Sequence, residues 1–228
     1  MNDRVSSGIK GLDDMTCGGF KKGSNNIIVG EAGTGKSTIA TQFLVEGMKN
    51  GEGAVYVSLE EKKEKFVNNM EQFGFKLGEY EKKGLFKFVE VNPKEIVDNI
   101  EQGIPTIETP VKEVKAKRLV IDSVTAFLLI FDSEKDRKNI LKQLFDKLDR
   151  WKLTMIMISE AHQEEARFGV SYLSDSIVKV DLKIDPKGNS RILLLEVYKM
   201  RGTKHKRAIV PFSITDTGVE VYPEQKMY

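Results

Sequence analysis

Short apolar segments alternate with amphipathic stretches from residue 27 to residue 158. The apolar-rich segments predict β-strands at residues 27–29, 55–59, 85–91, 119–121 and 155–158, of which 27–29, 119–121 and 155–158 are apolar enough to be buried. Between them, apolar residues recur every three or four positions, which predicts helices over residues 37–48, 66–73, 93–102 and 140–151. Strands that alternate with helices favour an α/β fold with a mostly parallel central sheet and helices on both faces.

The pattern changes after residue 176. Apolar and charged residues now alternate one by one from Val178 to Ile184, which is the period of a strand with one buried face. A turn at residues 185–189 and strands at 192–198, 209–214 and 219–222 predict antiparallel strands added to the C-terminal end of the sheet. The polar stretch around Pro105 and Pro110 is interpreted as a surface connection, because the β/α alternation continues on both sides of it. The prediction is one domain over residues 1–228.

Composition narrows the class of protein without pointing to a function. The 228 residues are 40% hydrophobic and 31% charged, as in soluble globular proteins, and the net charge of +2 gives no overall attraction to nucleic acid. Cys17, the single cysteine, cannot form an internal disulfide. It is expected to be a small packed residue in a reducing, cytoplasmic compartment. The N-terminus lacks a signal-peptide core and the apolar run at 126–131 is too short to span a bilayer, so no membrane insertion is expected.

A phosphate-binding motif follows the first apolar strand. Residues 30–37, GEAGTGKS, match G-x-x-x-x-G-K-[ST] at every fixed position, between a buried strand and an amphipathic helix. Backbone N–H groups of such a loop surround a phosphate, and the helix dipole adds to the attraction. Lys36 is expected to contact the β- and γ-phosphates of ATP, and the Ser37 hydroxyl to bind Mg²⁺. The predicted nucleotide-binding residues are Gly30, Glu31, Ala32, Gly33, Thr34, Gly35, Lys36, Ser37 and Thr38.

Acidic residues end two of the later apolar strands. Asp122 follows residues 119–121 and is predicted to hold the magnesium together with Ser37. Glu60 and Glu61 follow the strand at 55–59, and strand ends in open α/β sheets face the ligand crevice. One glutamate could activate water while the other tunes its basicity, and Glu60 is the preferred base. The alternative is that both acids open the next helix, where they favour the helix dipole.

These motifs together resemble the KaiC-like branch of the RecA superfamily of ATPases. The resemblance covers nearly the whole chain and implies a RecA-like P-loop fold with ATP and Mg²⁺ as ligands. The matching segments are SGI, GLD and GG within residues 7–19, GEAGTGKST at 30–38, SLEE at 58–61, IDSVT at 121–125, KMRGTKH at 199–205, and the closing strands from Pro211 and Phe212 to Gly218.

The resemblance also implies roles that spacing alone does not show. In this family ATP lies between adjacent subunits of a ring, usually a hexamer, so the chain is expected to form a homo-oligomer. Lys199 and Arg201 would then reach the γ-phosphate of a neighbour's nucleotide, as finger residues do. Thr203, His205 and Asp216 would line the nucleotide from the same side. From the residues alone, Lys199 and Arg201 are exposed charges at a strand end.

Two departures limit the resemblance. The KaiC clock protein carries two such domains, and this chain carries one. The clock protein phosphorylates serine and threonine in its second domain, but the corresponding second position here is Tyr172. Neither autokinase activity nor a circadian role follows from the resemblance.

Three functions are compatible with the sequence. The first is a slow, ring-forming ATPase that acts as a molecular switch or timer for a protein partner. The alternative is an ATP-responsive scaffold that hydrolyses little and docks a motor or signalling protein. A RecA-like DNA-binding recombination protein is the least favoured, because the candidate DNA loop at residues 163–174 carries one arginine and two glutamates.

Overall fold

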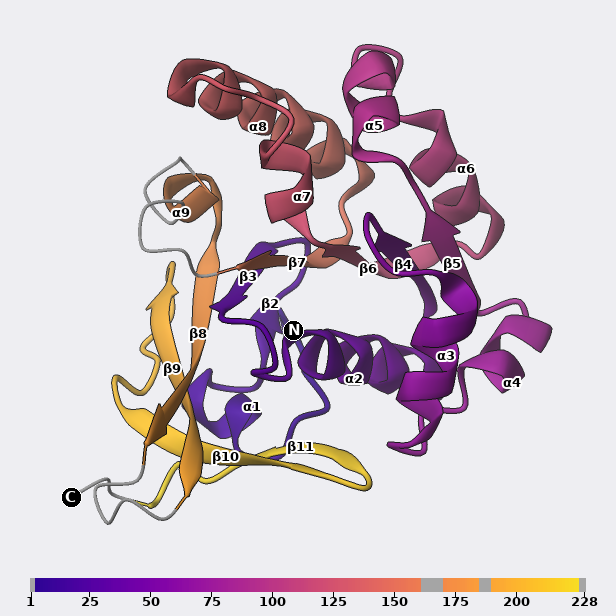
Figure 1. The fold of residues 1–228 in the computed structure, drawn as a ribbon. Coiled ribbons are helices and arrows are strands. Elements are labelled where there is room, and N and C mark those ends of the chain that lie inside the picture. The colour runs from indigo at the N-terminus through magenta and orange to yellow at the C-terminus, as the bar shows by residue number, and fades with distance from the viewer. Residues whose placement is uncertain (1–2, 161–169, 185–189, 226–228) are drawn as a thin grey trace.

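The structure is a computed structural model that describes residues 3–160, 170–184 and 190–225. Within these residues, nine strands form one sheet (Figure 1). In sequence order they are β3 (Asn25–Gly30), β4 (Gly53–Ser58), β5 (Phe86–Glu90), β6 (Ala116–Asp122), β7 (Thr154–Glu160), β8 (Ser176–Ile184), β9 (Arg191–Met200), β10 (Ile209–Thr215) and β11 (Gly218–Val221). Their order across the sheet is β11-β10-β9-β8-β3-β7-β6-β4-β5. The short strands β1 (Arg4–Val5) and β2 (Phe20–Lys21) form a separate ribbon.

Strands β8, β3, β7, β6, β4 and β5 are parallel, whereas β8, β9, β10 and β11 pair antiparallel with one another. The predicted mixed sheet is therefore confirmed, with antiparallel strands added at the C-terminal end. The predicted turn at residues 185–189 lies outside the described residues.

Helices cover both faces of the sheet (Figure 1). One face packs against α1 (Leu12–Met15), α2 (Lys36–Lys49), α3 (Lys63–Glu71) and α4 (Leu77–Lys82). The other packs against α5 (Pro93–Asn99), α6 (Pro105–Glu113), α7 (Val124–Leu128) and α8 (Glu134–Leu148), which leads into the 3-10 turn η1 (Asp149–Trp151). A short helix, α9 (Val170–Leu173), precedes β8. Each face has its own cluster of buried apolar side chains, because successive residues of a strand point to opposite faces.

The expected surface connection around Pro105 and Pro110 is wrong, because these residues form helix α6. Pro105 occupies the first turn, where a missing N–H group removes no helical hydrogen bond. Pro110 lies inside the helix, where it does remove one. Ile107 and Val111 are buried against the sheet, and this apolar contact stabilises the helix despite Pro110.

Cys17 is also placed differently from the expectation. It is exposed rather than packed, and its φ of 58° puts it in the left-handed region just after α1. Its Sγ lies 3.2 Å from the carbonyl oxygen of Lys204. The Gly18 N–H donates to the Asp13 carbonyl oxygen at 2.7 Å, which closes the turn after α1 with Cys17 in this conformation.

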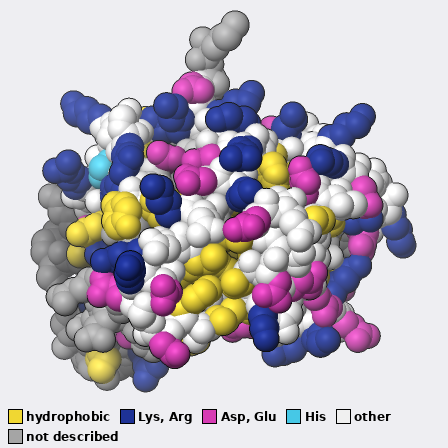
Figure 2. All heavy atoms as spheres, turned by 90° about the horizontal axis from the view of Figure 1, so that it is seen from above, with side chains coloured by type: hydrophobic (Ala, Val, Ile, Leu, Met, Phe, Trp, Pro, Cys, Tyr) yellow, Lys and Arg dark blue, Asp and Glu magenta, His cyan; other side chains and the backbone are white. Residues whose placement is uncertain are grey.

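The surface carries both charges. Figure 2 shows basic and acidic side chains interspersed around a hydrophobic area on the face seen from above. Helix α7 lies toward that side of the molecule in Figure 1, and Leu129 and Ile130, which follow it, are 65% and 41% exposed. Among the helices of the described ranges, none is long and apolar enough to cross a membrane.

The parallel register decides which residues meet at each edge of the sheet. Gly30 pairs with Glu160, and Ser58 pairs with Asp122. The C-terminal ends of β3, β7, β4 and β6 therefore lie together along one side of the sheet, which is called the P-loop edge below. This is the edge at which open α/β sheets bind ligands. The N-terminal ends of the parallel strands form the opposite edge. There, β8 starts beside the start of β3, and Met200 at the end of β9 pairs with Ser176.

Candidate functional site

The phosphate-binding loop joins the end of β3 to the start of α2, as the motif predicts. Gly33 and Gly35 have φ values of 79° and 81°, which favour glycine. A Cβ atom at Gly30 would come within 2.5 Å of Val180, so only glycine fits there as well. No heavy atom lies within 4 Å of the corresponding position at Gly33, which leaves open space above the loop. The loop thus has the shape of a phosphate cradle.

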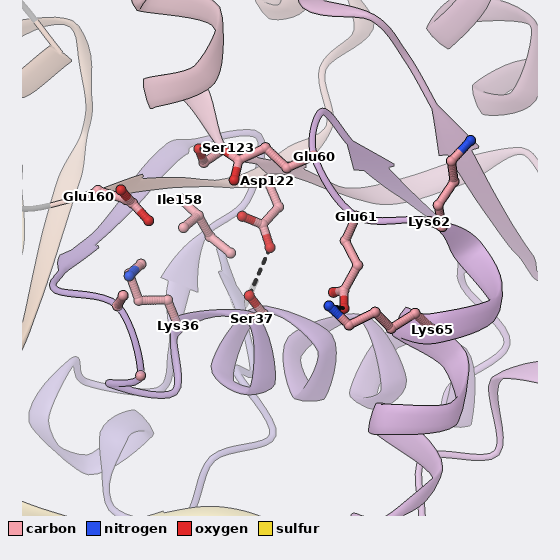
Figure 3. Close-up of a pocket in the computed structure, with 12 residues that line it drawn as sticks. Lys36, Ser37, Glu60, Glu61, Lys62, Lys65, Asp122, Ser123, Ile158 and Glu160 are labelled. Atoms are coloured by element: carbon pink, nitrogen blue, oxygen red, sulfur yellow. Dashed lines mark hydrogen bonds and ion pairs between the residues drawn. The ribbon is translucent and has the colours of Figure 1, made fainter.

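Lys36 is buried, and its Nζ donates a hydrogen bond to the Glu31 carbonyl oxygen at 2.8 Å. Burial lowers the pKa of Lys36, while the carboxylates of Glu160, Asp122 and Glu60 act in the opposite direction. Figure 3 shows Glu160 and Lys36 on the same side of the pocket, with their charged ends facing one another. The lysine therefore sits among acidic groups and can exchange its carbonyl partner for a phosphate oxygen.

The two predicted magnesium ligands are in contact. Ser37 Oγ donates to Asp122 Oδ2 at 2.8 Å, and the hydroxyl of Tyr56 donates to the same oxygen. Burial raises the pKa of Asp122, and the hydrogen bonds from Tyr56 and Ser37 partly offset that rise. A hydroxyl and a carboxylate beside a phosphate cradle are the hard oxygen donors that Mg²⁺ prefers, so the donor set fits this ion.

Glu60 and Glu61 both line the pocket but make different contacts. Glu60 Oε1 accepts a hydrogen bond from Ser123 Oγ at 2.8 Å. Glu61 Oε1 lies 3.6 Å from Lys65 Nζ and accepts from Asn69 Nδ2 at 3.2 Å. The charge of Glu61 is thus partly compensated by a cation, whereas Glu60 is held by a neutral hydroxyl. This difference favours Glu60 as a proton acceptor.

These groups surround a pocket of about 480 Å³ at the C-terminal edge of the sheet (Figure 3). Its walls come from the loop after β3, the ends of β4, β6 and β7, and the first turns of α2 and α3. The lining residues are Ala32, Gly33, Lys36, Ser37, Glu60, Glu61, Lys62, Lys65, Asp122, Ser123, Ile158 and Glu160. The structure therefore brings together the P-loop, both glutamates and Asp122, as the sequence predicts.

The residues that line the pocket but were not predicted as site residues are Lys62, Lys65, Ser123, Ile158 and Glu160. Tyr56, which contacts Asp122, was not predicted either. Ser123 and Glu160 end or follow apolar strands, and their positions at strand ends are the signal that could have pointed to them. Tyr56 lies in the middle of β4, and nothing in its neighbourhood along the chain marks it. Its link to Asp122 depends on the pairing of two strands that are distant in sequence.

Lys199 and Arg201 lie at the other edge of the sheet. Lys199 pairs with Ile177, which is level with Ile27 near the start of β3, whereas the P-loop follows the end of β3. Lys199 Nζ donates to the Ser174 carbonyl, and Arg201 Nη2 to the Tyr172 carbonyl, each at 2.6 Å. Burial lowers the pKa of Lys199, and the neighbouring Arg201 lowers it further. Neither side chain reaches the P-loop of the same chain.

The other three predicted nucleotide contacts are divided between the two edges. Thr203 and His205 follow β9, and Thr203 Oγ1 accepts a hydrogen bond from Arg4 Nη2 at 2.5 Å. His205 Nδ1 lies 3.2 Å from the Thr203 carbonyl oxygen. Asp216 lies in the turn after β10. The end of β10 is close to the P-loop, since a Cβ atom at Gly35 would come within 2.7 Å of Ile214 Cδ1. Their contacts with a nucleotide stay predictions.

The other candidate features are only partly described. Residues 163–169 of the candidate DNA loop lie outside the described residues. Within the described residues, no group of three or more histidine, cysteine, aspartate and glutamate side chains could hold a metal ion. The Ser37–Asp122 pair is a smaller set, of the kind that shares an ion with nucleotide phosphates.

Comparison with known proteins gives a consistent result. A model of the KaiC ATPase family matches residues 5–226. The chain is 36% identical to a UPF0273 protein of Aeropyrum pernix, over 99% of this chain and 96% of that protein. It is 30% identical to the circadian clock oscillator protein KaiC of Synechococcus elongatus, over 94% of this chain but only 43% of that protein. The structure matches that of a KaiC-like protein from Pyrococcus horikoshii with a TM-score of 0.85 and 33% identity, covering 96% of this chain and 99% of that one.

Proposed function

The chain belongs to the KaiC family of ATPases, and on that premise we propose that it hydrolyses ATP, with Mg²⁺, at a site that a neighbouring copy completes. The observation that supports this proposal is the separation of two groups of residues in one subunit. The P-loop, Glu60 and Asp122 share one edge of the sheet, whereas Lys199 and Arg201 lie at the other. Cations that cannot reach their own P-loop can serve the P-loop of another copy.

Each group has a distinct task at such a site. The backbone of the P-loop and Lys36 would hold the phosphates, and Ser37 and Asp122 would hold the metal. A bound Mg²⁺ would supply positive charge to the phosphates. Glu60, held by Ser123, orients the attacking water and accepts its proton. Without Lys199 and Arg201 of a neighbour, the site lacks two of the cations that this proposal assigns to the γ-phosphate, so an isolated subunit should hydrolyse ATP slowly.

Charge complementarity supports contact between unlike edges of two copies. The P-loop edge carries Glu31, Glu60, Glu61 and Glu160, and its lysines Lys62 and Lys65 lie within ion-pair distance of Glu90 and Glu61. The segment after β9 carries exposed Lys204, Lys206 and Arg207 beside Arg201, with Lys206 paired to Glu224. A contact between two different surfaces of one chain repeats from copy to copy and closes into a ring when the rotation allows. The proposed assembly is a hexameric ring, located in the cytoplasm, that acts as a switch or timer for a protein partner.

Mixing two inactive variants tests this proposal. Glu60→Gln removes the base from one side of the interface, and Arg201→Ala removes a cation from the other. Each variant alone should lose most of its ATPase activity. Copies that mix at random place an intact base opposite an intact cation at about one interface in four, so activity should partly return.

The outcome depends on which copy supplies each group. Lys117 is an exposed basic residue of β6 outside the site. The variant Lys117→Ala is the matched control and should keep full activity. No recovery on mixing, although the two variants co-assemble, would contradict a shared site. Equal hydrolysis by the wild type and Glu60→Gln would show that Glu60 is not the base. A wild-type protein that binds ATP without turnover would favour the scaffold function.

A further inference from the structure

Tyr56 is a tyrosine at a position where packing alone requires only a phenylalanine. It is 1% exposed and lies in the middle of β4 on the face that packs against α2. Its ring contacts Phe66 and Phe88, with centroid separations of 4.2 Å and 5.5 Å. A phenylalanine would fill the same space among these rings. The hydroxyl is therefore the part of Tyr56 that needs another explanation.

The hydroxyl of Tyr56 is directed at the metal ligand. Tyr56 pairs with Val120 of β6, and Asp122, two residues further along β6, points to the same face of the sheet. This diagonal relation brings the phenol to Asp122 Oδ2, the oxygen that also accepts a hydrogen bond from Ser37. Two hydroxyl groups, one from β4 and one from α2, thus bind one carboxylate oxygen.

We propose that the Tyr56 hydroxyl is a positioning group that fixes the rotation of the Asp122 carboxylate for magnesium binding. This inference rests on the proposed function, because it assigns Tyr56 a role at the Mg²⁺·ATP site. Without the phenol, Ser37 is left as the partner of Asp122 Oδ2, and the carboxylate gains rotational freedom. Hydrogen bonds to metal-binding carboxylates contribute to metal affinity for this reason.

Nucleotide affinity with and without magnesium tests the inference without relying on activity. Calorimetry would measure ADP binding to the full chain in Mg²⁺ and in EDTA. In the wild type, Mg²⁺ should strengthen binding. In Tyr56→Phe, that gain should fall on the order of tenfold. Affinity in EDTA should not change, because the P-loop binds the phosphates by itself.

Two further variants separate the hydroxyl from the packing around it. Phe88→Leu disturbs the same aromatic cluster but keeps the phenol, so it should lower the unfolding midpoint and leave the magnesium gain intact. Tyr80→Phe makes the same chemical change at a half-buried position away from Asp122 and should alter neither quantity. The inference is overturned if Tyr56→Phe keeps the full magnesium gain, or if Phe88→Leu loses as much of it.

These outcomes are distinct from failure of the proposed function. A wild-type chain whose ADP affinity does not depend on Mg²⁺ would contradict the magnesium role of Ser37 and Asp122, and the Tyr56 inference would fall with it. A wild type that shows the magnesium gain and hydrolyses ATP, beside a Tyr56→Phe variant identical to it, would contradict the role of Tyr56 alone.

Discussion

Asp122, the proposed magnesium ligand, shows how a residue suited to a binding role can reduce the stability of the fold. Its carboxylate is withdrawn from water at the end of β6 and is held by the hydroxyls of Tyr56 and Ser37. Burial raises its pKa, so the folded chain binds this proton more tightly than the unfolded chain does. In the absence of metal, the ionised group therefore costs stability at neutral pH. A divalent cation would offset that cost when it binds.

Asp122→Asn is expected to stabilise the metal-free protein by about 0.5–2 kcal/mol, since the amide keeps a similar shape and can accept both hydrogen bonds. The cost of the ionised carboxylate is complete above its folded pKa and vanishes below its unfolded pKa. The difference from the wild type should therefore be largest at neutral pH and shrink in acid. Urea unfolding in EDTA over this range would measure it.

The exposed Asp132 provides the control for this experiment, because Asp132→Asn removes a solvated charge and should leave stability nearly unchanged. A difference between Asp122→Asn and the wild type that widens in acid would contradict the assignment. The same variant should also lose the magnesium-dependent part of nucleotide binding, which separates stability from function at this residue.

At the scale of elements, the packing of α2 against the sheet depends on a buried arginine. Arg118 of β6 is 3% exposed, and its Nε donates a hydrogen bond to Glu52 Oε2 at 2.6 Å. Its guanidinium donates to the carbonyl oxygens of Phe43 and Ser6 at 2.7 Å and 2.8 Å. These contacts join β6, the C-terminal half of α2 and the N-terminal segment. The arginine also passes close to Gly47, where a Cβ atom would lie 2.3 Å from its Nε.

Gly47→Ala is therefore expected to destabilise the protein by about 1–3 kcal/mol, because the pinned arginine cannot move away from the new methyl group. This reverses the usual effect of alanine in a helix. Gly78→Ala in α4 is the matched control, since no atom lies within 4 Å of its Cβ position, and it should stabilise by up to about 1 kcal/mol. Thermal unfolding of both variants measures the contrast. Equal shifts of the same sign would contradict it.

At the scale of the whole molecule, the proposed site spans two copies, so assembly should depend on nucleotide. Light scattering in Mg²⁺·ATP is expected to give up to six times the 25.8 kDa of one chain, and a smaller species in EDTA. Lys36→Ala should weaken the nucleotide-dependent step, because it removes the main charge that holds the phosphates. A monomer under both conditions would contradict the shared site.

Much of the fold and of the site follows from local pattern. The mixed sheet, the helices with clear apolar stripes and the whole P-loop were predictable, because periodicity and glycine conformation are properties of neighbouring residues. Helix α6 was missed because its buried residues Ile107 and Val111 are interrupted by Pro110, and tertiary packing stabilises the helix in spite of that proline. Cys17 was misplaced because its exposure depends on a turn after α1.

The sequence by itself determined the motifs that are contiguous along the chain: the phosphate loop, the two glutamates after β4 and the aspartate that ends β6. Tertiary structure alone decided which distant residues meet them. Tyr56 reaches Asp122 across 66 positions of sequence, and Glu160 faces Lys36, through the order and register of parallel strands. The same register places Lys199 and Arg201 at the opposite edge. Local patterns specify strands and turns but not the pairing of distant strands, and that pairing decides which charges share a site.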